Sequence, residues 1–221
     1  VVLGEAGAGK TTVLRRLVLD GAEAALRVLG KAQEPIVLPI FIRLSTLTPG
    51  KTLEQVILEV LQGYEIQEFE TEEDVIQLLN GKPLDQIAVH SILFLMDGLN
   101  EMTAQEQTRP ELSRFIRQYG HHRFILSCRV QDYTTLQGFR TALLQRLAGE
   151  DIEAFLVNYL SADQGRKVAR EIYSDDQLED LAQTPLALFM LAQIAKNSEE
   201  ALPKNRGVLF EVFTDNLLER A

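Results

Sequence analysis

The sequence predicts an α/β fold, with a parallel sheet flanked by helices, followed by a small all-helical subdomain. Three observations predict it. Apolar strand-like runs alternate with amphipathic helical segments over residues 1–148, a pattern typical of parallel sheets. Residues 149–221 show helical periodicity alone. A glycine-rich octapeptide joins the first strand directly to the first helix. We therefore predict two domains, residues 1–148 and 149–221.

The strands of the first domain are short runs of β-branched and large apolar residues, at positions 1–3, 36–42, 92–96 and 123–128. Residues 92–96 are continuously apolar, as in a strand that is buried on both faces. A turn is expected at residues 48–51, where Pro49 precedes Gly50.

The helices of this domain show apolar residues at intervals of three and four, over residues 13–29, 53–62, 72–80 and 109–119. The second and third are expected to stop at Gly63 and Gly81, and Pro110 is placed in the first turn of the fourth. The subdomain is predicted to contain helices over residues 149–160, 163–173, 177–183, 185–197 and 207–220.

The octapeptide has the spacing G-x-x-x-x-G-K-[ST] of a phosphate-binding loop, in the residues Gly4, Glu5, Ala6, Gly7, Ala8, Gly9, Lys10 and Thr11. Its glycines let the backbone curl so that successive N–H groups point at phosphate oxygens, and the following helix favours an anion at its N-terminus. Lys10 supplies a charge for the β and γ phosphates, and the Thr11 hydroxyl is a ligand for Mg²⁺. We predict a P-loop NTPase that binds nucleotide through residues 4–12, Thr12 included; the alternative is a glycine-rich turn.

Two acidic residues follow the buried strand at 92–96. Asp97 lies at the carboxyl end of that strand, where the Mg²⁺ of a bound nucleotide is expected. Glu101 is placed to orient or deprotonate an attacking water. A turn residue before Gly98 is the alternative for Asp97.

Arg129 follows the strand at 123–128, a position that places its guanidinium beside a bound γ-phosphate. There it could distinguish a triphosphate from a diphosphate. A surface salt bridge is the alternative.

Composition narrows the classes of partner. The net charge of −10 and the pI of about 4.9 argue against a nucleic-acid surface, which needs clustered Lys and Arg. The acidic stretch from Glu65 to Asp74 is interpreted as a solvated loop or helix start, with a partner site as the alternative. The sequence has no long apolar run of the kind that inserts into a membrane.

The single cysteine, Cys128, excludes an internal disulfide and favours a reducing, cytoplasmic location. It lies in an apolar run, so we expect it to be a small core residue. The chain begins without Met and in the middle of a strand, which indicates a piece of a longer protein.

These motifs, in this order, resemble the NACHT family, within the signal-transduction (STAND) branch of P-loop ATPases. The resemblance rests on residues 4–12, on the small Gly98 after Asp97, on Ser127-Cys128-Arg129, and on Thr184-Pro185-Leu186 before an apolar helix. Residues 202–210 also resemble the stretch that precedes the last helix of that family's first helical domain. The resemblance covers essentially the whole chain.

The resemblance implies a regulatory switch. Such proteins hold ADP in a closed monomeric form, exchange it for ATP on a signal, and then self-associate. Effector and sensor domains would belong to the same full-length chain. By motif, residues 4–12 would hold the phosphates, Thr11 and Asp97 the Mg²⁺, Arg129 would be the sensor, and Pro185 would pack near the adenine.

One departure bears on hydrolysis. The family commonly shows two acidic residues after Asp-Gly-hydrophobic, and here the first of them is Asn100. Because an amide is no general base, hydrolysis would depend on Glu101 and be slow. The absence of an N-K-x-D motif favours ATP over GTP. Two alternatives stay open: a mechanochemical P-loop ATPase, and a nucleotide-stabilised interaction scaffold without turnover.

Overall fold

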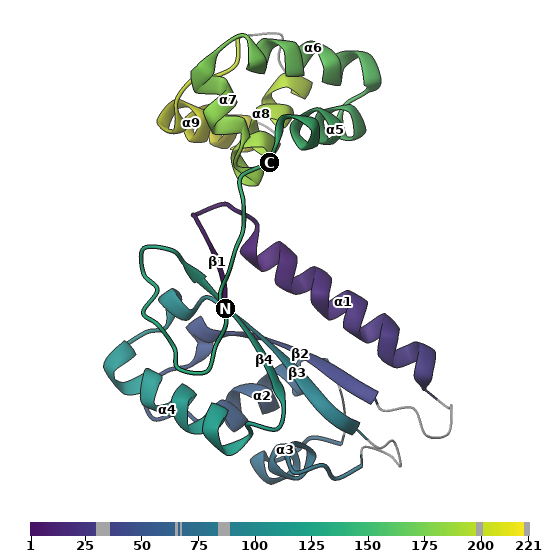
Figure 1. The fold of residues 1–221 in the computed structure, drawn as a ribbon, viewed down its shortest axis with the longest axis vertical. Helices are drawn as coiled ribbons and strands as arrows, with labels where there is room; N and C mark the ends of the chain where they lie inside the picture. The colour runs from purple at the N-terminus through teal and green to yellow at the C-terminus, as the bar shows by residue number, and fades with distance from the viewer. Residues whose placement is uncertain (30–35, 65, 67, 84–88, 198–200, 219–221) are drawn as a thin grey trace. The chain divides into compact units, whose positions relative to one another are not determined.

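A computed structural model describes residues 1–29, 36–64, 66, 68–83, 89–197 and 201–218. Its first part is a five-stranded parallel sheet in the order β2-β3-β4-β1-β5 (Figure 1). The strands are β1 (Val2–Gly4), β2 (Ile36–Arg43), β3 (Val89–Asp97), β4 (Arg123–Arg129) and β5 (Ala142–Leu143). The predicted fold class, a parallel sheet flanked by helices, is confirmed.

Helices cover both faces of the sheet. Helix α1 (Lys10–Val28) packs against β1 to β4, and α2, α3 and α4 lie on the opposite face (Figure 1). Their bounds are Leu53–Gln62, Glu72–Leu79 and Gln105–Gln118, and the short 3₁₀ helices η1 (Leu44–Thr46) and η2 (Leu99–Glu101) follow β2 and β3. The larger of the two apolar cores lies between the sheet and helices α2, α3 and α4.

Side-chain caps define where two of these helices begin. The Thr52 hydroxyl accepts the Gln55 N–H at the start of α2, and Thr71 does the same for Asp74 at the start of α3. The end of the acidic stretch is therefore the first turn of α3. Carboxylates at this position interact favourably with the positive end of the helix dipole. Residues 65 and 67 of that stretch, like residues 219–220 of the last predicted helix, lie outside the described residues.

Two predictions about local structure are corrected, and one strand was not predicted. Helix α1 begins at Lys10 rather than residue 13, because the phosphate-binding loop leads directly into it. Pro110 is the sixth residue of α4 rather than part of its first turn, since the helix starts at Gln105. The two-residue strand β5 has no sequence signal, because its pairing with β1 is non-local and too short to show alternation.

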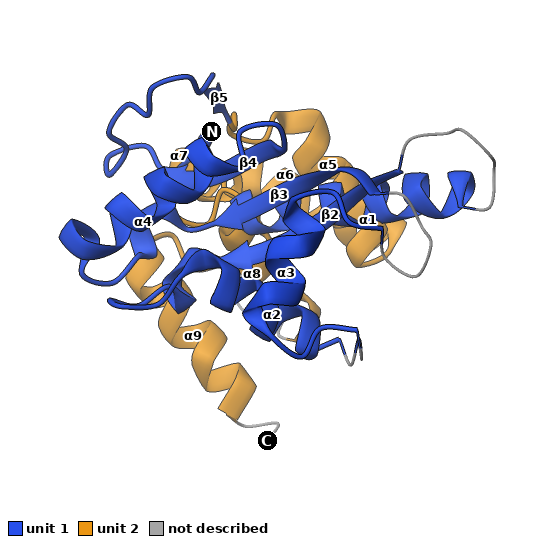
Figure 2. Ribbon diagram, turned by 90° about the horizontal axis from the view of Figure 1, so that it is seen from below, with its two compact units in different colours: residues 1–4, 10–143 blue, residues 5–9, 144–221 orange. Residues whose placement is uncertain are grey.

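Contacts divide the described chain into two units, shown in blue and orange in Figure 2. The first contains residues 1–4 and 10–143, and the second contains residues 5–9 and 144–221. The second unit is helical, with α5 (Gly149–Tyr159), α6 (Ala162–Tyr173), α7 (Asp176–Ala182), α8 (Pro185–Asn197) and α9 (Arg206–Leu218) around its own apolar core. The boundary between residues 148 and 149 stays a prediction. Within the described ranges, no helix combines the length and apolar content that crossing a bilayer requires.

Gly165 allows α5 and α6 to pack closely. A Cβ on this residue would lie 2.7 Å from the backbone carbon and oxygen of Leu156 and from Cα of Val157. Because these are backbone atoms, a side chain could be accommodated only by moving α6 away from α5.

We expect Gly165→Ala to destabilise the chain by about 1–3 kcal/mol, the usual cost of overpacking. Helix propensity alone would predict a gain of about 1 kcal/mol, so the sign of the change reports the close approach. Gly149→Ala is the control, because its new Cβ would meet only the side chain of Tyr173, at ordinary contact distances of 3.5 to 3.9 Å. Urea unfolding of both variants gives the comparison; equal stabilities would contradict the packing argument.

Candidate nucleotide-binding site

Three parallel strands of the first unit end at the same edge of the sheet. Gly4 ends β1 and pairs with Arg129 at the end of β4, and Asp97 ends β3, which pairs with β4. The sheet therefore brings together Asp97 and Arg129, 32 positions apart in the sequence, at the edge where open α/β sheets bind ligands.

The loop glycines play different conformational roles. Gly7 has φ +78° and Gly9 has φ +86°, so both adopt the left-handed backbone that glycine tolerates best. Gly4 departs from the predicted curl, because it is a strand residue within β1. Its carbonyl instead accepts a hydrogen bond from Lys10 Nζ at 3.0 Å.

Lys10 and Thr11 are the first two residues of α1. Partial burial lowers the pKa of Lys10, and the neighbouring charge of Arg129 lowers it further, while the carboxylates of Asp97 and Glu101 oppose the shift. The three other charged groups of the first unit that we predicted as functional therefore all act electrostatically on Lys10.

The carboxylate of Asp97 is held on both oxygens. Thr11 Oγ1 donates to Asp97 Oδ2 at 2.7 Å, and Ser127 Oγ donates to Asp97 Oδ1 at 2.5 Å. The Gly98 N–H in turn donates to Ser127 Oγ at 2.8 Å. The two residues predicted to bind Mg²⁺, Thr11 and Asp97, are thus direct neighbours.

Glu101 folds back over the turn that follows β3. Gly98 has φ +81°, and a Cβ on it would lie 2.8 Å from Glu101 Oε2 and 3.0 Å from Glu101 Cδ. Only a residue without a side chain permits this approach. The small residue after Asp97 is therefore what lets Glu101 lie against the same turn.

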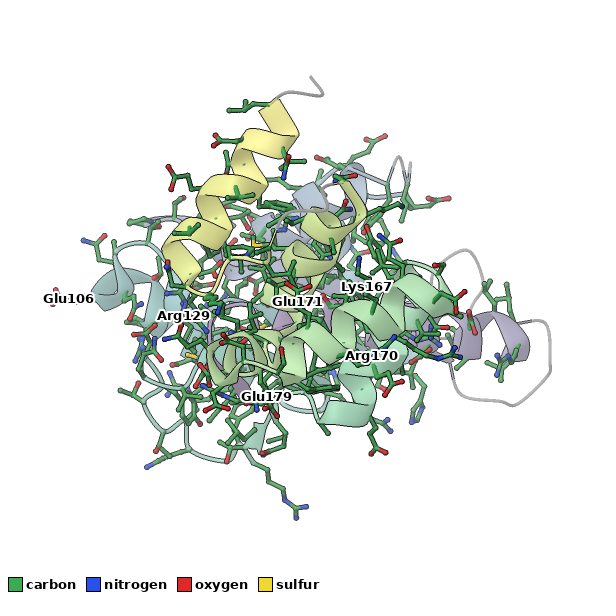
Figure 3. The ribbon with its side chains drawn as sticks, turned by 90° about the horizontal axis from the view of Figure 1, so that it is seen from above. Glu106, Arg129, Lys167, Arg170, Glu171 and Glu179 are labelled. Carbon is green, nitrogen blue, oxygen red and sulfur yellow. The ribbon has the colours of Figure 1, made fainter. Side chains whose placement is uncertain are left out.

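Asn100 connects this turn to Arg129. Its Oδ1 accepts the backbone N–H of Arg129 at 3.0 Å. The amide thus fixes the backbone at the end of β4, from which the Arg129 side chain (labelled in Figure 3) projects. The sequence singled out Asn100 as a departure and did not predict this contact.

Loop residues 5–9 belong to the helical unit, and the contacts within that unit explain why. The Leu186 N–H, in the first turn of α8, donates to the Gly7 carbonyl at 3.3 Å. Arg146 pairs with Glu5 at 3.5 Å and with Asp180 of α7 at 2.5 Å.

Pro185 is the first residue of α8, and its Cγ would lie 3.9 Å from a Cβ on Gly9. Proline is suited to this position, where its missing N–H has no intrahelical partner. Pro185 thus lies beside the phosphate-binding loop, and its contact with adenine stays a prediction.

The oxygen donors fit a magnesium ion bound together with a nucleotide. Within the described ranges there is no group of three or more His, Cys, Asp or Glu side chains that could hold a metal by itself. A nucleotide-bound Mg²⁺ needs only one or two protein oxygens, because phosphates and water supply the rest. The Thr11 hydroxyl and the Asp97 carboxylate match that requirement.

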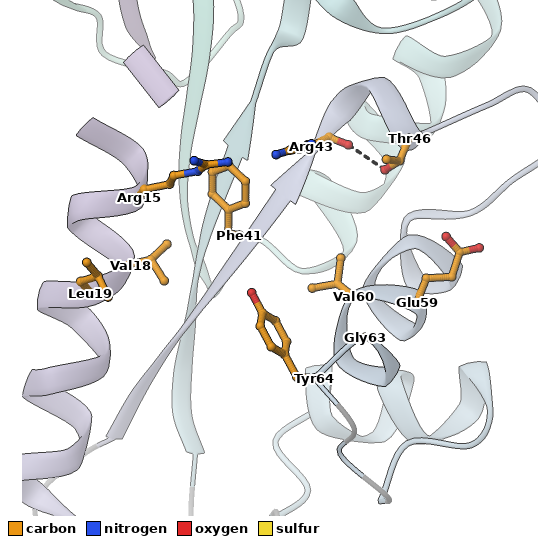
Figure 4. A pocket seen from close by; sticks show the side chains of 10 residues that line it. All are labelled: Arg15, Val18, Leu19, Phe41, Arg43, Thr46, Glu59, Val60, Gly63 and Tyr64. Carbon is orange, nitrogen blue, oxygen red and sulfur yellow. Dashed lines mark hydrogen bonds between the residues drawn. The ribbon is translucent and has the colours of Figure 1, made fainter. Parts of the chain in front are cut away.

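The first unit also has a groove away from these residues. It has a volume of about 590 Å³ and lies between α1, β2 and α2 (Figure 4), where Val18, Phe41, Val60 and Tyr64 form much of its apolar lining. None of the predicted site residues lines it. The candidate site is therefore identified by its chemistry rather than by the size of a cavity.

Comparison with known proteins agrees with this geometry. The family model of the NACHT domain matches residues 1–176. NLR family CARD domain-containing protein 4 is 25% identical over 228 residues in Bos taurus and also 25% in Mus musculus, covering all of this chain and 20% of each relative. The chain thus spans about a fifth of the length of these curated relatives.

Solved structures share the fold at low sequence identity. The ORC2 protein of Aeropyrum pernix, in its ADPNP–ADP complexes, matches with a TM-score of 0.56 and 14% identity, over 97% of this chain and 61% of that one. Drosophila ORC bound to DNA matches with a TM-score of 0.52 and 13% identity, over 98% and 54%. These matches support the fold, and the family match covers most of the sequence. The chain belongs to the NACHT family.

Proposed function

We propose that the chain is the nucleotide-binding core of a regulatory switch, held off by ADP and turned on by ATP, with slow ATP hydrolysis. One observation carries the proposal: at the carboxyl edge of the sheet, Thr11 donates a hydrogen bond to Asp97, whose charge also acts on the neighbouring Lys10. The N–H groups of the loop and Lys10 bind the phosphates. Thr11 and Asp97 hold Mg²⁺, which neutralises charge on the β and γ phosphates.

Within this proposal, Glu101 orients or deprotonates the attacking water. It supplies the carboxylate of the turn after β3, since Asn100 is an amide engaged with the Arg129 backbone. Arg129 reads the γ-phosphate, because its end of β4 is paired with the residue that begins the loop. With a single carboxylate in this role, we expect ATP hydrolysis to be slow.

Adenine is the proposed base. The relative from Aeropyrum with the same fold is described in complex with ADPNP and ADP. The present sequence has no N-K-x-D motif for guanine. Pro185 lies beside the loop and provides an apolar surface for the base.

The contacts of residues 5–9 support switching. A change in the backbone of the phosphate-binding loop would alter the Leu186–Gly7 hydrogen bond and the Arg146–Glu5 pair, both of which lead to the helical subdomain. A response of that subdomain to nucleotide requires contacts of this kind, because a ligand shifts an equilibrium only through differential interactions.

The proposed partners are other copies of the chain in the ATP state and effector and sensor domains of the full-length protein, whose relatives are about five times longer. The acidic composition favours neither nucleic acid nor membrane as a direct partner. We place the protein in the cytoplasm, where a free, buried Cys128 is stable.

Lys10→Ala tests nucleotide binding directly. At a hundred times its dissociation constant, Mg-ATP should stabilise the wild type by about 2.7 kcal/mol, and the variant should lose this gain. Lys167→Ala on α6 (Figure 3) removes an exposed lysine and should keep it. Thermal unfolding with ATP, ADP, GTP and GDP measures both the site and its base preference. An undiminished gain in Lys10→Ala would reject this loop as the site.

Glu101→Gln should bind ATP and hydrolyse it at least about 100-fold more slowly, because the amide cannot accept a proton. Glu106→Gln, in the first turn of α4, is the matched control and should hydrolyse ATP at the wild-type rate. Single-turnover release of phosphate gives both rates. Unchanged hydrolysis in Glu101→Gln removes Glu101 from the mechanism, and binding without turnover in the wild type favours the scaffold.

Gly98→Ala should displace Glu101 as well as strain the backbone. Gly50→Ala is a matched control, because Gly50 has the same φ of +81° with nothing within 4 Å of its new Cβ. Both variants should lose about 1–2 kcal/mol of stability from the left-handed backbone. Only Gly98→Ala should slow hydrolysis; equal rates in the two variants would show that the Gly98–Glu101 approach is irrelevant to turnover.

A further inference from the structure

Ser127 is a buried hydroxyl within the apolar strand β4. Its side chain is fully buried, and its neighbours from Phe124 to Cys128 are otherwise apolar. The hydroxyl donates to Asp97 Oδ1 at 2.5 Å and accepts the Gly98 N–H at 2.8 Å. Both its donor and its acceptor capacity are therefore directed at two consecutive residues of the candidate site.

A second buried serine provides the contrast. Ser91 lies in β3 with 7% exposure, and its Oγ has no hydrogen-bond partner among the described residues. A buried serine in this sheet is therefore not automatically bonded to the site. The two bonds of Ser127 result from its position opposite the end of β3.

The consequence concerns the orientation of a carboxylate. The terminal torsion of an aspartate is soft and roughly two-fold, so an Asp carboxylate held at one oxygen can rotate. With Oδ1 held by Ser127, Oδ2 is directed at Thr11 Oγ1, 2.7 Å away. The same serine fixes the peptide that joins Asp97 to the left-handed Gly98.

We propose that Ser127 is a positioning residue for magnesium: it holds the Asp97 carboxylate so that Oδ2 and the Thr11 hydroxyl face one cation. The inference rests on the proposed function, because it concerns the Mg²⁺ of a bound nucleotide. Ser127 itself does not touch the ion. Outer partners of this kind typically change metal affinity by about 10–100-fold when they are removed.

The test separates magnesium from nucleotide. For the whole chain and its Ser127→Ala variant, the thermal shift caused by ATP is measured in EDTA and across a magnesium titration. We expect the half-saturating Mg²⁺ concentration to rise about 10-fold or more in Ser127→Ala, with the ATP shift in EDTA unchanged. Each variant is compared with its own ligand-free form, so a general loss of stability cancels.

Ser91→Ala is the matched control, since it deletes the same atom from the neighbouring strand without touching a partner. Its magnesium titration should match that of the wild type. If Ser127→Ala does not fold, Ser127→Cys keeps a side chain of similar size with a weaker donor, and it should show an intermediate shift.

Two results would overturn the inference alone: a wild-type magnesium titration in Ser127→Ala, or an equal loss of the ATP shift with and without magnesium. The second result would mean that Ser127 supports the fold of the site as a whole. If the wild type gains no stability from ATP under either condition, the proposed function fails, and the inference fails with it.

Discussion

The candidate site depends on the hydrogen bonds that hold one carboxylate, that of Asp97. Thr11 reaches it from the first residues of α1, and Ser127 reaches it from β4. These bonds join three segments that are far apart in sequence, and the parallel pairing of the strands is what allows it. Because parallel strands end at one edge, their following residues meet there without a dedicated loop.

A second constraint is the close approach of backbone in the turns at this edge. Gly7, Gly9 and Gly98 all have positive φ, and a Cβ on Gly7 or Gly98 would also lie within 3.0 Å of a neighbouring side chain. At Gly7 the neighbours are Thr184 and Leu186, which belong to the helical subdomain. A side chain at Gly7 would therefore strain the left-handed backbone of the loop and would also crowd Thr184 and Leu186.

Much of this could be predicted from the sequence, because the signals are local. The periodicity of residues 53–62 and the stop at Gly63 predict both ends of α2, and the loop spacing identifies Lys10 and Thr11, although the sequence placed the start of α1 three residues too late. Contacts between distant residues could not be predicted. The pair between Arg146 and Glu5 spans 141 positions, and nothing in the run around Ser127 says which strand its hydroxyl faces. Serine within an apolar strand was the available signal, since most buried hydroxyls are hydrogen-bonded, but Ser91 carries the same signal and has no partner among the described residues.

The amide at Asn100 has a physical reason that a motif comparison leaves out. Its Oδ1 accepts the Arg129 N–H, a task that an aspartate carboxylate could also perform. An aspartate would add a third negative charge to a turn that already carries Asp97 and Glu101, next to phosphates that are themselves anionic. The amide keeps the tether to β4 without that repulsion. In the proposed switch, Asn100 therefore cannot act as a second base, but it also adds no charge that would repel the phosphates. Both effects favour tight binding of the nucleotide over fast hydrolysis.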